Sequence, residues 1–169
     1  LEGALWDEAT KAPEMLDGKA YLRVLEFDVK AEKWTGRHWK YVMDANHHAI
    51  GDFNMIDETT GMIIERDNSE GTPDKACRTG TQRTDCFHDL PKFKRVYKID
   101  FAQTDADGFV KKVAFIDLTK IANPQRAAKR GPNEETFVLP HLGPEGLTVV
   151  DANHIVVVND NSFPYSSGR

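Results

Sequence analysis

Carboxylate and amide side chains gather at the ends of several predicted strands. Glu65 and Asp67 follow the apolar run 62–64, and Asn159 and Asp160 follow the apolar run 155–158. A strand that is apolar throughout is expected to be buried on both faces, and carboxylates beside it need a partner. Calcium suits them because it binds about six to eight oxygen atoms from carboxylates, amides and water. The predicted calcium ligands are Glu2, Asp52, Glu65, Asp67, Glu145, Asn159 and Asp160.

Two histidines are candidate general bases near such a metal. His48 precedes the segment that contains Asp52, and His141 lies shortly before Glu145. Arg66 is the third candidate catalytic residue, although it can equally form a purely structural ion pair with a neighbouring carboxylate. Polar strand ends and surface histidines are common, so at each position the alternative is a residue with no role in binding or catalysis. The chain has no His-Glu-x-x-His, Gly-x-Ser-x-Gly or phosphate-binding glycine motif, so zincins and ordinary serine esterases lack their signatures.

Charge and hydropathy exclude some other classes. Among 169 residues, 27 are acidic and 22 are basic, which gives a formal charge of −5 without any basic block. This balance argues against a nucleic-acid-binding surface. No stretch approaches the roughly 20 apolar residues of a membrane span. Because the sequence starts at Leu1 and not at a methionine, we expect a processed or excised chain.

The two cysteines flank a short polar segment. Cys77 and Cys86 enclose residues 78–85, which are too polar to form a core. This arrangement favours a disulfide formed in an oxidising compartment over two free thiols. A zinc site is disfavoured because neither cysteine belongs to a Cys-x-x-Cys pair.

Alternation of apolar and polar residues predicts an all-β chain. Strands are expected at 21–29, 38–43, 95–101 and 110–118, with hairpins formed by 49–56 with 61–67 and by 146–150 with 155–158. The segment 30–36 is expected to be a turn, and 68–91 a long surface loop. Helix is expected only in the regions 7–15 and 119–130.

A repeated dipeptide suggests how the strands are arranged. Glu2-Gly3 and Glu145-Gly146 each precede an apolar residue at a predicted strand entry, 143 positions apart (145 − 2). This distance is close to three units of the roughly 40–50 residues typical of a propeller blade. Blades around an axis bring distant carboxylates together at one channel. We therefore expect a β-propeller, with residues 1–169 forming about three to four blades of a single domain.

The order of the motifs resembles a known family, the secreted bacterial β-propellers called "esterase-like activity of phytase". Its most recognisable element is Glu65-Arg66-Asp67. The other segments that carry the resemblance are 1–5, 23–28, 39–41, 48–52, 63–68, 95–100, 110–112, 144–147 and 158–168. The resemblance implies a secreted or periplasmic calcium-dependent hydrolase that acts on phosphate or carboxylic esters.

The sequence is also compatible with two other functions. One is a non-catalytic secreted propeller that binds calcium only to hold its blades. The other is a lactonase of the gluconolactonase or paraoxonase type, which also uses Glu, Asn and Asp around calcium. In each case the expected partner is the remainder of the propeller, as a cleaved fragment or a second subunit.

Overall fold

The computed structural model describes residues 4–128 and 135–160, and within them the chain is all-β. No α-helix occurs in these ranges, and only a short 3₁₀ turn, η1, lies at Pro73–Lys75. None of the described helical segments is long and apolar enough to span a membrane. The strands are β1 (Trp6–Asp7), β2 (Ala12–Pro13), β3 (Met15–Leu16), β4 (Lys19–Asp28), β5 (Lys33–Val42), β6 (Ala49–Met55), β7 (Thr60–Arg66), β8 (Lys94–Thr104), β9 (Val110–Asp117), β10 (Ile121–Ala122), β11 (Thr136–Phe137), β12 (Gly143–Val149) and β13 (Ile155–Asp160).

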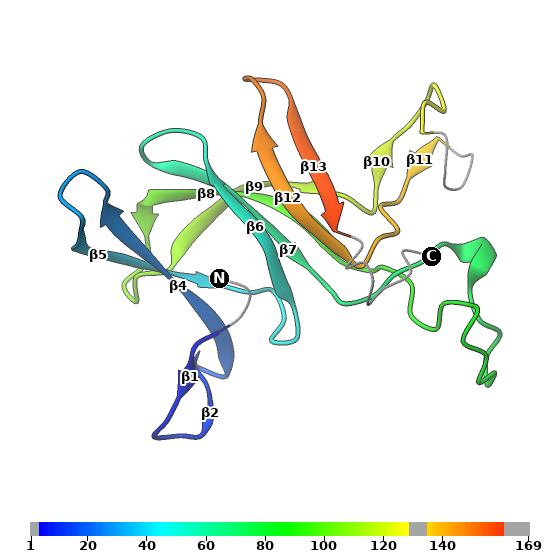
Figure 1. Cartoon of the computed structure of the whole chain (residues 1–169), viewed down its shortest axis with the longest axis horizontal. Coiled ribbons are helices and arrows are strands. Elements are labelled where there is room, and N and C mark those ends of the chain that lie inside the picture. Colours follow the sequence, from blue (N-terminus) through cyan, green and yellow to red (C-terminus); the bar gives the residue numbers. More distant parts are fainter. Residues whose placement is uncertain (1–3, 129–134, 161–169) are drawn as a thin grey trace.

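The strands form small antiparallel sheets, none of them closed (Figure 1). The largest is the four-stranded sheet β6-β7-β8-β9, which has the three-stranded sheet β3-β4-β5 on one side and the hairpin β12-β13 on the other. Two further pairs, β1-β2 and β10-β11, are short. The strands and hairpins predicted from alternation are confirmed, although β5 already begins at Lys33, inside the segment expected to be a turn.

The four-stranded sheet separates two apolar cores. Strand β7 alternates between them, because Ile63 packs with Tyr41 of β5 whereas Ile64 packs with Leu147 of β12. All four of these side chains are buried. The run 62–64 is therefore apolar throughout because each face of its sheet is covered by another sheet, as a strand buried on both sides requires.

The inner strands β6 and β12 are joined by side chains instead of a regular ladder. A register shift in β6 between Ile50 and Phe53 contains Gly51 and Asp52. A Cβ atom on Gly51 would lie 1.9 Å from the carbonyl oxygen of Pro144, so only glycine allows this approach. Beyond it, the Asp52 carboxylate accepts a hydrogen bond from the Leu147 amide at 2.7 Å, and Asn54 donates to the Leu147 carbonyl.

Neither helical expectation is confirmed in the described residues, outside which residues 129 and 130 of the second region lie. In the region 7–15, Asp7 accepts a hydrogen bond from the Ala9 amide, and Pro13 disfavours helical backbone at Ala12, so the segment forms the β1-β2 hairpin. In the region 119–130, Asp117 accepts hydrogen bonds from Thr119. Pro124 follows β10 there and interrupts any helix that would continue through it.

The long loop between β7 and β8 is confirmed and contains the predicted disulfide. Cys77 and Cys86 are bonded, with their Cα atoms 5.0 Å apart. The loop is tied to the rest of the molecule where the Gly71 amide donates to the carbonyl of Pro140, 2.7 Å away. Gly71 has φ of +104°, and Phe87 packs against it so closely that a Cβ atom there would overlap the ring.

Candidate active site

The antiparallel register brings most of the predicted site residues to one end of the sheets. Arg66, the last residue of β7, pairs with Ala49, the first of β6, and with Lys94, the first of β8. In the neighbouring hairpin, Gly143 at the start of β12 pairs with Asp160 at the end of β13. The Gly51–Pro144 contact places this end of the hairpin beside the same end of the larger sheet.

Glu65 is completely buried and is surrounded by hydrogen-bond donors. Its Oε1 accepts from the Asp44 amide at 2.6 Å and contacts His48 Nδ1 at 2.7 Å. Its Oε2 accepts from the Tyr41 hydroxyl at 2.6 Å and from Lys112 Nζ at 2.9 Å. These donors offset the desolvation of a buried carboxylate.

The network continues through Asp44 to the aromatic side chains of β8. Asp44 accepts hydrogen bonds from Lys112 and from the Tyr97 hydroxyl, and pairs with Arg95 at 3.4 Å. Burial by itself would raise the pKa of Asp44, but the bonds from Lys112 and Tyr97 outweigh it and hold the pKa below its ordinary value. Burial and the bond to Asp44 raise the pKa of Tyr97 to about 12. Burial, with Glu65 close by, likewise raises the pKa of Tyr41.

His48 is another buried member of this network. Its side chain is 5% exposed, whereas that of Glu65 is 0% exposed. The imidazole stacks on Phe93, with ring centroids 4.2 Å apart, and the ring of the exposed His47 lies edge-on to it, with centroids 4.8 Å apart. Because the Glu65 carboxylate is an acceptor, Nδ1 is the donor in this contact, and Nε2 is the remaining ring nitrogen.

Arg66 points to the opposite face of β7, toward the β12-β13 hairpin. It donates to Glu145 Oε1 at 3.0 Å and to Asn68 Oδ1 at 2.6 Å, and its side chain is 12% exposed. Its buried Nε has no hydrogen-bond partner in the described structure, and neither has the buried Oδ1 of Asn159. Unpaired buried polar atoms are uncommon and indicate where a ligand, ion or water would bind.

Asp67 forms a buried ion pair at the start of the long loop. Lys94, which is fully buried, lies 3.2 Å from Asp67 Oδ1. Burial lowers the pKa of Lys94, and Asp67 opposes this effect. Burial would raise the pKa of Asp67, but hydrogen bonds from the Lys92 and Phe93 amides, together with Lys94, hold it below its ordinary value.

The remaining predicted residues are less closely grouped. Asp52 lies within β6 and holds β12, His141 is exposed, and Asp160 is exposed at the end of β13. Glu2 lies outside the described residues. The structure therefore brings Glu65 together with His48, and Arg66 with Glu145, on opposite faces of one strand.

The donors around these residues limit where calcium can bind. The oxygens of Asp52, Glu65 and Asp67 accept hydrogen bonds from amide, hydroxyl or ammonium groups. Among the described residues, no cluster of His, Cys, Asp and Glu has the size and spacing to hold a metal. One observation fits a bound cation. The Oδ1 of Asn159 has no hydrogen-bond partner in the described structure, and Asn159 pairs with Pro144, the residue before Glu145.

The sequence did not predict the residues that form hydrogen bonds and ion pairs around the buried carboxylates. Asp44, Lys94, Arg95, Tyr97 and Lys112 come from segments distant in sequence, and no local motif indicates that they meet. The one available signal was Lys94 at the start of an apolar strand, a position at which burial of its stem is expected.

Comparison with known proteins gives one finding. The family model described as phytase-like, esterase-like activity of phytase matches residues 1–163. The chain belongs to this family. Membership points to a hydrolase-like function, and it agrees with the resemblance carried by Glu65-Arg66-Asp67. No curated protein matches the chain, and no solved structure matches it either.

Proposed function

We propose that the chain is part of a calcium-dependent hydrolase of phosphate or carboxylic esters. The observation that carries this proposal is the contact of His48 Nδ1 with the buried Glu65 carboxylate, 2.7 Å away. A carboxylate that holds Nδ1 orients the imidazole and leaves Nε2 as the atom that can accept a proton. Membership of the phytase-like family supports the same class of reaction.

In this proposal His48 is the general base. Its Nε2 accepts a proton from the attacking water, and Glu65 stabilises the imidazolium that results. Lys112 and Tyr41 donate to the other oxygen of Glu65 and hold the carboxylate in place. Arg66 lies on the opposite face of β7 from His48, where its unpaired Nε would bind an anionic oxygen of a substrate held beside Glu145. His141 is a second candidate base, and its exposed position leaves it accessible to substrate.

We place the calcium ion at Glu145, Asn159 and Asp160. Support comes from the unpaired Asn159 Oδ1 and from the pairing of Pro144 with Asn159 and of Gly143 with Asp160. Bound calcium would polarise the ester oxygen. Glu2, Asp52, Glu65 and Asp67 were also predicted as ligands, and of these the described ones bind protein donors instead.

Hydrolysis assays with and without calcium test the proposal. p-Nitrophenyl phosphate, p-nitrophenyl acetate and a δ-lactone are offered separately to the protein in calcium and in excess chelator. We expect turnover of a phosphate or carboxylic ester that is lost in chelator and restored by added calcium. Turnover of the lactone alone would favour the lactonase, and absence of turnover of all three would contradict the hydrolase.

A calcium-binding protein without catalysis is the second candidate. It is favoured by the unpaired Oδ1 of Asn159, because a calcium ion bound there would hold the end of the β12-β13 hairpin without any reaction. For such a protein, chelation lowers the midpoint of thermal unfolding while no substrate is turned over. Calcium titration followed by both unfolding and activity therefore separates the two candidates.

We also propose a secreted or periplasmic location. The disulfide between Cys77 and Cys86 supports it, because disulfides persist in oxidising compartments. Recovery of the oxidised protein from the periplasm or medium of the producing cell tests this location.

A further inference from the structure

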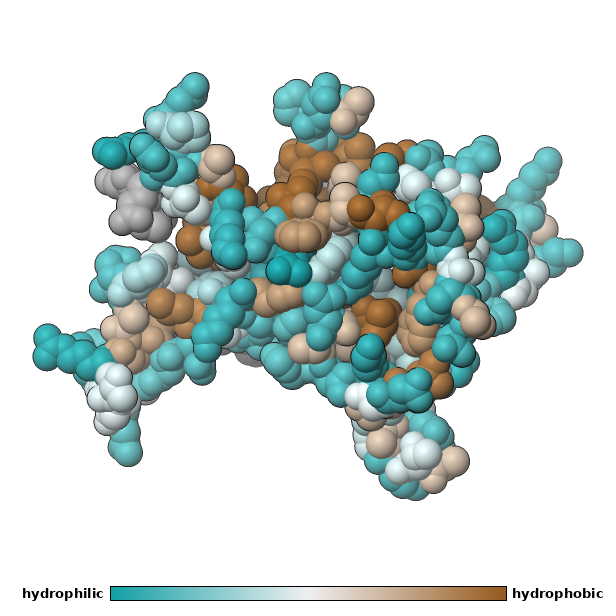
Figure 2. Space-filling view, turned by 180° about the vertical axis from the view of Figure 1, so that it is seen from behind, coloured by the Kyte–Doolittle hydropathy of each residue, from teal (hydrophilic) through white to brown (hydrophobic). Residues whose placement is uncertain are grey.

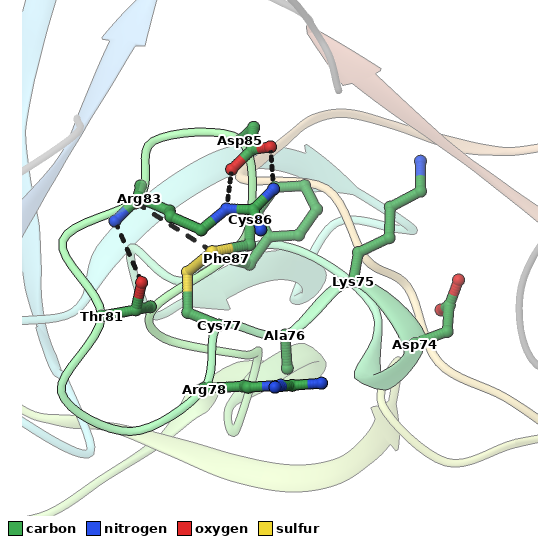
Figure 3. Close-up of a pocket in the computed structure, with 10 residues that line it drawn as sticks. All are labelled: Asp74, Lys75, Ala76, Cys77, Arg78, Thr81, Arg83, Asp85, Cys86 and Phe87. Atoms are coloured by element: carbon green, nitrogen blue, oxygen red, sulfur yellow. Dashed lines mark hydrogen bonds and ion pairs between the residues drawn. A yellow bond between two sulfur atoms is a disulfide. The ribbon is translucent and has the colours of Figure 1, made fainter.

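The disulfide loop encloses a hollow that is separate from the candidate active site. It has a volume of about 730 Å³. Figure 3 shows the residues that line it, with the Cys77–Cys86 bond and the Phe87 ring at its centre. The remaining lining residues are Asp74, Lys75, Ala76, Arg78, Thr81, Arg83 and Asp85.

The loop holds this hollow in a defined shape. The disulfide joins its two sides, and backbone hydrogen bonds connect Phe87 with Lys75 at 3.0 Å and with Cys77 at 2.8 Å. Phe87 is buried and packs on Gly71, whose amide is bonded to Pro140. A preformed site loses less conformational entropy when a ligand binds than a mobile loop does.

The positive charges of the lining are not all neutralised. Arg83 forms a forked pair with Asp85, with its Nε 2.7 Å from Oδ1. No described residue forms a hydrogen bond or ion pair with the guanidinium of Arg78, or with the ammonium group of Lys75. In Figure 3 the Arg78 side chain and the Arg83–Asp85 pair lie on either side of the disulfide.

We propose that this hollow binds a small oxyanion, a phosphate or carboxylate group. Arg78 supplies a forked pair of N–H donors, the geometry that matches both groups. Thr81 supplies a hydroxyl at the wall, and Phe87 with the disulfide offers an apolar surface for the rest of the ligand. The site binds its anion whether or not the chain hydrolyses esters, so it goes beyond the proposed function.

Two charge-changing variants give the sharpest test, because one is expected to weaken anion binding and the other to strengthen it. Binding of inorganic phosphate, phenyl phosphate and acetate is measured by calorimetry at low salt. We expect Arg78→Ala to weaken binding by about fivefold or more, since a charge-assisted hydrogen bond is lost. Asp85→Asn is expected to strengthen binding severalfold, because it removes a negative charge and releases Arg83 to the anion. Arg23→Ala is the matched control, since Arg23 is exposed but pairs with Glu14 outside the loop.

The disulfide provides a second test of the same site. In Cys77→Ser/Cys86→Ser, the loop must be ordered by the ligand, so binding is expected to weaken by about fivefold or more. Circular dichroism verifies that the sheets remain folded in this variant. Stronger binding of phosphate than acetate identifies a phosphate site, and the reverse identifies a carboxylate site. Absence of binding of all three probes, or equal affinities in Arg78→Ala and Asp85→Asn, would overturn the proposal.

Discussion

A carboxylate as deeply buried as Glu65 persists in a folded protein only when donors replace the water it has lost. Tyr41, His48 and Lys112 provide them from other segments of the chain. The same contacts serve stability and the proposed chemistry, because the carboxylate that holds His48 is itself held by Lys112 and Tyr41. Glu65 is therefore the residue on which both depend.

Removing the charge of Glu65 should destabilise the protein strongly. Glu65→Gln keeps the shape but leaves the Lys112 ammonium group without its buried partner, and we expect a loss of about 3 kcal/mol in the free energy of unfolding. Urea denaturation measures it. The matched control is Glu26→Gln, whose ion pair with Arg37 is exposed, with an expected change of about 0.5 kcal/mol or less. Equal losses in the two variants would contradict the role of the buried network.

Stability should fall in acid because of Asp44 and Asp67. Their pKa values in the folded protein lie below the ordinary 3.8. Each carboxylate therefore contributes stability that is present above its unfolded pKa and is lost as the pH falls through its folded pKa. We expect Asp44→Asn/Asp67→Asn to flatten the dependence of unfolding free energy on pH between about pH 5 and about pH 2. A slope as steep as in the unchanged protein would contradict this assignment.

At the scale of the elements, the junction of β6 with β12 depends on a bulge. The register shift at Gly51 and Asp52 lets the Asp52 carboxylate and the Asn54 amide bind the backbone of Leu147. The two sheets thus remain separate while their inner strands are connected. This junction places Glu145 beside Arg66, so the geometry of the proposed site follows from it.

Adding one methyl group at Gly51 should separate these strands. In Gly51→Ala the new Cβ overlaps the Pro144 carbonyl, so we expect a loss of about 2–3 kcal/mol in the free energy of unfolding. Gly18→Ala is the control, because Gly18 has φ of +74° but open space around it. That change should cost about 1 kcal/mol through backbone strain alone. A smaller loss in Gly51→Ala than in Gly18→Ala, measured by urea denaturation, would refute the close contact.

The strands and hairpins could be predicted from the sequence, but most of the side-chain contacts between them could not. The β6-β7 and β12-β13 hairpins follow from local alternation and turn residues, which is why they could be predicted. The opposite orientation of Glu65 and Arg66 follows from the two-residue period of a strand. The pairing of Lys112 with Glu65 joins residues 47 positions apart, and it depends on tertiary packing that alternation does not encode.

At the scale of the whole molecule, apolar side chains remain on the surface (Figure 2). Val156 and Val158 of β13 are 46% and 55% exposed, on the face of the hairpin that turns away from the core with Leu147. On the far strand of the large sheet, Phe115 is 54% exposed. Exposed apolar faces of this kind mark surfaces on which another element packs. We propose that further sheets of a β-propeller, from a cleaved fragment or a second subunit, cover them.

The chain on its own should therefore associate with itself. We expect its mass from light scattering to rise with concentration, because the β13 face is apolar. Val156→Thr/Val158→Thr keeps β-branched side chains but removes apolar surface, so it should reduce this association without a large loss of stability. A monomer at every concentration tested would contradict the need for a covering sheet.

The proposed role of His48 as general base is measured by the rate of ester hydrolysis in His48→Asn. We expect kcat/KM for the ester turned over to fall by about 100-fold or more, since the general base is lost. His154→Asn is the matched control, because His154 also contacts a carboxylate, Asp151 at 2.8 Å, but lies exposed in the turn between β12 and β13. It should keep the rate of the unchanged protein. Equal rates in His48→Asn and His154→Asn, with both variants folded, would show that His48 is not the general base.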